Sequence, residues 1–95
     1  MTEPDDDVPR RLRLTNREYR YLQVADDLAS RIQAGEFPFD AALPVRADLR
    51  LEYGVGEMTV RHALAVLADR GMVRPMPGRG TIVIWQGTSR AHHNY

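Results

Sequence analysis

Two glycines divide much of residues 43–81 into short elements. A helix of about two turns fits residues 46–53, because Gly54 can take the positive φ that ends a helix. After a tight turn, apolar residues recur at helical spacing over residues 57–70, and Gly71 ends this further helix. The sequence therefore predicts a helix-turn-helix unit.

A hairpin is expected after these two helices. Residues 72–76 and 81–85 are typical of strands, and the Pro-Gly-Arg-Gly sequence of residues 77–80 provides a turn between them. An amphipathic helix precedes the unit at residues 18–34, with Gly35 placed to cap its C-terminus. Three helices followed by a two-stranded β-hairpin predict an α+β fold, a winged helix-turn-helix in which the hairpin is the wing.

The helix expected over residues 57–70 has two distinct faces. Its buried face consists of apolar residues at helical spacing: Val60, Ala63, Leu64 and Leu67. Its outward face carries the residues between them: Met58, Arg61, His62, Ala65 and Asp69. The first face can hold the helix to the domain while the second meets a partner, and a helix has the right width for the major groove of DNA.

The outward face offers groups suited to double-stranded DNA. Arg61 lies one turn into the helix, where its guanidinium can make two hydrogen bonds to a guanine edge. The Thr59 hydroxyl is placed to bond a phosphate, and the helix N-terminus adds amide donors and partial positive charge. His62 can donate to a phosphate or a base, and Met58 can pack on a thymine methyl group. An ordinary surface role is the alternative for each of these residues.

The expected hairpin turn carries a second set of candidate contacts. Gly78 and Gly80 keep the backbone slim enough to approach a groove, and Arg79 between them suits a narrow minor groove, where the negative potential is enhanced. Arg46 and Arg74 are candidates for phosphate contacts. A Gly-Arg-Gly turn alone is weak support, since glycine serves many hairpins, so the hypothesis rests on the turn and the helix together.

Charge is unevenly distributed along the chain. Thirteen basic and thirteen acidic residues give a net charge of zero, but four of the acids lie within the first seven residues. Residues 43–90 contain seven arginines against four acids, an excess of positive charge on the half expected to meet a duplex. Every basic residue is arginine, which suits bidentate bonds to phosphate and guanine. Codon usage in a GC-rich genome explains that preference equally well.

Several other classes of protein are disfavoured. The absence of cysteine excludes disulfides and thiolate metal sites. No apolar run approaches the roughly 20 residues of a membrane span, and the acidic start is unlike a signal peptide, so we expect a soluble cytoplasmic protein. Catalysis is not expected, because no carboxylate pair sits at a Gly-rich loop and no Ser-His-Asp set is suggested. Neither a metal site nor a cofactor is expected, and the adjacent His92 and His93 cannot alone close a metal site. Ninety-five residues also leave no room for a separate ligand-sensing domain, so no small-molecule effector site is expected.

A series of short motifs occurs in a fixed order and spacing: residues 21–28, 32–37, 43–44, 49, 52–55, 58–64, 67, 71–73 and 78–83. Together they resemble the N-terminal winged-helix domain of the GntR family of bacterial transcription regulators. The resemblance implies a repressor or activator whose helix at 57–70 lies in the major groove and whose wing reaches the neighbouring minor groove. It matches Thr59 to a phosphate contact, Arg61 to a base contact, and Gly78, Arg79 and Gly80 to the wing tip. Family members usually bind palindromic sites as dimers, so a homodimer is the expected assembly.

Three features depart from the family pattern. Leu-Pro is commonly followed by Ser-Glu-Arg, whereas residues 45–47 are Val-Arg-Ala, so that Arg46 or Arg50 must substitute from a different angle. Glu57 stands where an arginine or another donor is common, and a carboxylate near the groove repels phosphate unless it accepts from a cytosine amino group. The family also appends a C-terminal effector-binding and dimerising domain, whereas this sequence stops at Tyr95, as expected of a stand-alone short regulator or of a fragment. The initiating methionine favours the former.

We expect three segments along the chain: a disordered arm at residues 1–16, a winged helix-turn-helix DNA-binding domain at 17–86 and a flexible tail at 87–95. A rival function is that of a protein-interaction module, accessory to or antagonist of a larger regulator. Zero net charge, together with Glu57 and Met58 near the outward face, suits this alternative. The salt dependence of binding to duplex DNA distinguishes the two functions.

Overall fold

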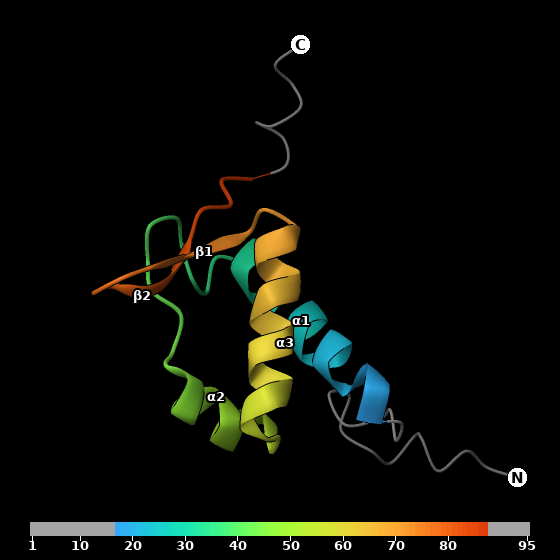
Figure 1. Ribbon diagram of the computed structural model, residues 1–95. Coiled ribbons are helices and arrows are strands. Elements are labelled where there is room, and N and C mark those ends of the chain that lie inside the picture. The colour runs from blue at the N-terminus through green and yellow to red at the C-terminus, as the bar shows by residue number, and fades with distance from the viewer. Residues whose placement is uncertain (1–16, 88–95) are drawn as a thin grey trace, which may run out of the picture.

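The computed structural model describes residues 17–87, so the arm expected at 1–16 and the tail expected after residue 87 lie outside the described residues. Three helices are followed by two strands: α1 (Arg17–Gln33), α2 (Arg46–Tyr53), α3 (Glu57–Asp69), β1 (Val73–Met76) and β2 (Gly80–Val83). Figure 1 shows α3 lying across α1, with α2 beside one end of α3 and the hairpin projecting near the other. The predicted winged helix-turn-helix is confirmed. Within residues 17–87, no helix has the length and apolar character needed to cross a bilayer.

The turn between α2 and α3 forms where glycine permits it. Gly54 has a φ of +67°, and its N–H donates to the carbonyl oxygen of Arg50 at 2.8 Å. This left-handed conformation is strained for residues that carry a Cβ, which is why glycine ends α2 here. Val55 then turns back into the core, and Gly56 precedes α3 in an extended conformation. The two helices are therefore held at a fixed distance by three residues.

One hydrophobic core joins the three helices and the hairpin. Its buried side chains come from every element and from the connections between them: Val24, Ala25, Leu28, Ala29, Ile32, Leu43, Leu49, Tyr53, Val55, Val60, Ala63, Leu67, Met72, Val73 and Val83. Leu64 was expected on the buried face of α3, but it is only half-buried because it lies at the edge of the core toward the hairpin. The remaining positions of the predicted buried face are confirmed.

The base of the wing is tied to the connection between α1 and α2. The strands are antiparallel, with Val73 opposite Val83. The Leu43 N–H donates to the Thr81 carbonyl oxygen at 2.9 Å, and the Val83 N–H donates to the Ala41 carbonyl oxygen at 2.9 Å. This backbone pairing along β2 was not predicted from the sequence. It fixes the hairpin relative to the segment that leads into α2.

The core contribution of α2 can be measured with two leucines of the same helix. Leu49 is fully buried, whereas Leu51 is 82% exposed. We expect Leu49→Ala to lower the free energy of unfolding by about 2–5 kcal/mol, because it removes buried methyl groups and leaves a cavity. Leu51→Ala should change it by less than about 0.5 kcal/mol. Urea titration followed by circular dichroism measures both variants, and similar losses in the two would contradict this packing.

Candidate nucleic-acid interface

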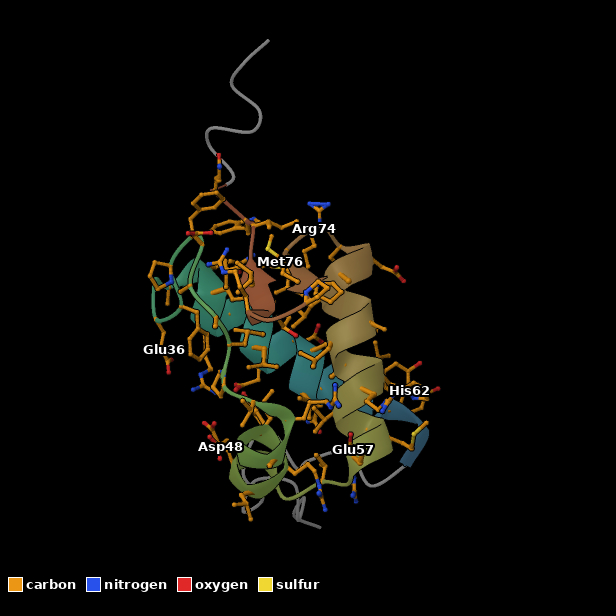
Figure 2. All side chains as sticks on the ribbon, turned by 60° about the vertical axis from the view of Figure 1, so that its left-hand side comes forward. Glu36, Asp48, Glu57, His62, Arg74 and Met76 are labelled. Atoms are coloured by element: carbon orange, nitrogen blue, oxygen red, sulfur yellow. The ribbon has the colours of Figure 1, made fainter. Side chains whose placement is uncertain are left out.

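The outward face of α3 and the hairpin border the same hollow. This hollow measures about 230 Å³ and is lined by residues from the start of α2, from α3 and from both strands: Arg46, Arg61, Leu64, Ala65, Ala68, Val73, Pro75 and Thr81. Figure 2 brings forward the side from which the hairpin projects in Figure 1. The helix expected to enter a groove, α3, and the expected wing therefore face the same side of the molecule.

Two of the candidate arginines meet at one carboxylate in this region. Glu57 is the first residue of α3, and its Oε2 accepts a hydrogen bond from Arg46 Nε at 3.0 Å. The same oxygen lies 3.7 Å from Nη1 of Arg61, one turn further along α3. The Arg46 and Arg61 side chains remain 52% and 55% exposed. The pairing therefore orients both guanidinium groups without removing them from solvent.

The other candidates on α3 lie apart from the hollow. His62 meets the ring of Tyr21 edge-on, with the ring centroids 5.2 Å apart, so it lies toward α1 and at the margin of α3 in Figure 2. Met58 is 62% exposed, and Thr59 is half-buried in the first turn. No side chain caps the N-terminus of α3 at Gly56, so no side-chain acceptor competes there for its first amides.

The wing tip has the backbone shape that its glycines suggest. Gly78 and Gly80 have φ values of +83° and +96°, and both are exposed. The Arg79 guanidinium reaches the connection between α1 and α2, where Nη1 and Nη2 lie 3.4 Å from the Asp40 carboxylate and Nη2 lies 3.2 Å from its carbonyl oxygen. Arg79 is thus exposed but directed at Asp40, a partner that sequence reasoning missed because 39 residues separate the two.

A second polar network holds α2 against α1. Arg31 Nη1 donates to the Tyr53 hydroxyl at 2.8 Å, and this hydroxyl donates to Asp27 Oδ2 at 2.5 Å. Arg31 also makes a two-point contact with Glu36, at 3.0 and 2.7 Å, and pairs with Glu52 at 2.9 Å. Because Tyr53 is the last residue of α2, the network fixes the end of that helix opposite Arg46.

These contacts shift the acid–base properties of both central residues. Burial raises the pKa of the Tyr53 phenol well above its usual range, and its hydrogen bond to Asp27 raises this pKa further. The carboxylate of Glu36 likewise raises the pKa of the Arg31 guanidinium. At neutral pH the phenol is therefore a proton donor to Asp27, and Arg31 is a permanent cation between carboxylates.

Comparison with known families identifies relatives of the region just described. A family model described as "Bacterial regulatory proteins, gntR family" matches residues 20–83. The chain is 41% identical over 63 residues to an uncharacterized HTH-type transcriptional regulator, RB1450, of Rhizobium meliloti (strain 1021). It is 36% identical over 63 residues to the HTH-type transcriptional repressor NagR of Bacillus subtilis (strain 168). Each match covers 66% of this chain and 26% of the relative, so the chain spans only a small part of their length.

Solved structures with the same fold include one bound to DNA. AraR(DBD) in complex with operator ORR3 is similar with a TM-score of 0.63 and 32% sequence identity, covering 66% of this chain and 76% of that chain. A possible transcriptional regulator, YydK, from Bacillus subtilis subsp. subtilis str. 168 gives a TM-score of 0.65 at 24% identity, covering 72% of this chain and 30% of that chain. At that identity the second likeness concerns the fold alone.

The protonation of Tyr53 provides a test of the network between α1 and α2. We expect the Tyr53 phenol to stay protonated above pH 10, the usual pKa of a tyrosine, so phenolate absorbance should include a late phase in addition to an early one. Tyr53→Phe should abolish the late phase and leave the early one. Since folded Tyr53 holds its proton more tightly than the unfolded chain does, the associated stability is intact below about pH 10 and is lost as the pH rises further. Loss of early-phase amplitude in Tyr53→Phe would contradict this.

Proposed function

Because the chain belongs to the gntR family of bacterial regulatory proteins, we propose that it binds double-stranded DNA sequence-specifically and thereby regulates transcription. In this proposal α3 lies in the major groove and the wing reaches the adjacent minor groove. The observation that carries it is the hollow lined jointly by Arg46, Arg61 and the hairpin residues Pro75 and Thr81, since one duplex can then meet both elements. Such a role places the protein in the bacterial cytoplasm.

The residue roles follow from their positions. Arg61, exposed on α3, is the candidate for a bidentate contact to guanine. Arg46, at the start of α2, and Arg74, exposed on β1, suit phosphates on either side of the groove. Thr59 and the uncapped first amides of α3 are further phosphate donors. Met58 and His62 lie outside the hollow, so we assign them peripheral contacts along the sides of α3.

To reach the minor groove, Arg79 at the wing tip has to leave Asp40. Its contacts to Asp40 are long, at 3.2–3.4 Å, and both side chains are largely exposed. An exposed pair of this kind contributes only about 0–1 kcal/mol, so its release costs little. The enhanced negative potential of a narrow minor groove then offers a stronger site for the guanidinium between Gly78 and Gly80.

The assembly on DNA is also part of the proposal. NagR is named as a repressor, and AraR(DBD) was solved with an operator. We propose that this chain likewise recognises an operator and that two copies bind a palindromic site, because two half-sites add their contacts. Sedimentation with and without a palindromic duplex tests the dimer, and one copy per duplex at saturating protein would refute it.

The salt dependence of binding separates a DNA reader from a protein-interaction module. Each phosphate neutralised by arginine releases counterions, so the two contacts assigned to Arg46 and Arg74 should lower the association constant of each copy roughly 12-fold between about 50 and 200 mM salt. Fluorescence anisotropy with a labelled duplex selected from a random pool measures this change. Absence of binding at the lower salt concentration would favour the protein-interaction module instead.

Base reading by Arg61 is tested against a matched arginine near the other end of α3. Arg70 follows α3, and its guanidinium contacts Asp26 of α1 at 2.9 Å, away from the hollow. We expect Arg61→Ala to weaken binding to the selected duplex by about 1–3 kcal/mol and binding to random duplex by less. Arg70→Ala removes the same charge and should affect both duplexes slightly and equally. Equal losses on the two duplexes for Arg61→Ala would contradict the base contact.

A further inference from the structure

Glu57 places a carboxylate beside Arg46 and Arg61, two arginines of the surface assigned to DNA. It begins α3, its side chain is 41% exposed, and Figure 2 shows it on the side turned toward the viewer, together with α2. The helix dipole favours an acidic residue in the first turn, whichever way its side chain points. The dipole therefore does not explain why the Glu57 carboxylate contacts two particular arginines.

Both contacts recorded for Glu57 use a single carboxylate oxygen. Oε2 accepts from Arg46 Nε at 3.0 Å and lies 3.7 Å from Arg61 Nη1. A carboxylate can accept about four hydrogen bonds through its two oxygens. Within residues 17–87 the structure shows no contact to Oε1, so this oxygen retains its capacity to accept a donor from outside.

The two arginines also remove the electrostatic objection to a carboxylate near phosphates. One negative charge lies beside two guanidinium groups, so the cluster of Arg46, Glu57 and Arg61 carries a net positive charge. Exposed ion pairs attract weakly, which leaves the arginines able to turn toward DNA. The carboxylate can therefore approach a groove within a surface that is positive as a whole.

We propose that Glu57 is a specificity-determining residue that recognises cytosine in the major groove. This inference rests on the proposed function. Cytosine presents only an amino donor at that edge, which suits Oε1, whereas guanine and thymine present acceptors that repel a carboxylate. Adenine presents an acceptor beside its amino group and is a poorer partner.

The positions of the two residues predict where the cytosine lies. Four residues advance a helix by about 6 Å, or roughly two base steps of 3.4 Å each. The N-terminal residues of a recognition helix are those that contact base edges, and Glu57 is the first of them in α3. The cytosine should therefore lie within about two base pairs of the guanine that Arg61 contacts.

Selection of bound sequences from a random duplex pool tests this inference. The wild type should enrich cytosine about tenfold at one position near a guanine, and Arg61→Ala should lose the guanine alone. Glu57→Gln should replace that cytosine by adenine, because an amide bonds both N6 and N7 of adenine. Glu57→Ala should leave no preference there. Thermal melting establishes that each variant is folded before selection.

The matched control is Asp48→Asn, which changes the net charge equally. Asp48 is exposed in the first turn of α2 and points away from Glu57 in Figure 2. The sequences selected by Asp48→Asn should keep the preference for cytosine. If Glu57→Gln also retains it, and only binds all sequences more tightly, Glu57 acts as charge alone and the inference is overturned. If the wild type enriches no sequence, the proposed function itself fails and the inference fails with it.

Discussion

The orientation of α3 depends on three side chains that are completely buried, those of Val60, Ala63 and Leu67. Because their spacing follows one face of a helix, packing them against α1 determines which residues face outward. Arg61 cannot be turned inward without exposing Val60, and burial of a valine stabilises the fold by about 1.5–3 kcal/mol. The surface offered to a partner is thus set by the core beneath it.

The second requirement is that α2 stays in place relative to α1, since Arg46 lies at the start of α2. Here hydrophobic and polar contacts act together. Leu49 and Tyr53 enter the core, while the Tyr53 hydroxyl extends into the network of Arg31 and Asp27. Such a network fixes a geometry more than it adds stability, because the hydrogen bonds replace those once made to water. Contacts at the C-terminal end of α2 therefore fix the position of the helix, and with it the position of Arg46 at its start.

Sequence reasoning predicted most of this architecture because local signals are strong. Gly54 and Gly71 mark helix ends, so α2 was predicted at its observed bounds and α3 to within one residue. The family resemblance is confirmed over residues 20–83. What escaped prediction involves partners far apart in the chain. The pairing of residues 41–43 with β2 is made by backbone groups, which leave no side-chain pattern to detect.

At the candidate interface, too, contacts between residues distant in sequence escaped prediction: the arginines could be named from the sequence, but their partners could not. Arg46 and Arg61 share Glu57, and Arg79 contacts Asp40. In the proposed complex with DNA, each of these arginines leaves a carboxylate for a group on the duplex, so binding exchanges one partner for another. An exposed pair gives about 0–1 kcal/mol, whereas a bidentate contact to the correct base gives about 1–3 kcal/mol. On a wrong sequence an arginine gains only a phosphate contact, and salt screening leaves that contact scarcely stronger than the ion pair it replaces. The exchange is therefore clearly favourable only on the correct sequence. In the proposed complex with DNA, the carboxylates of Glu57 and Asp40 would thus reduce non-specific binding more than specific binding.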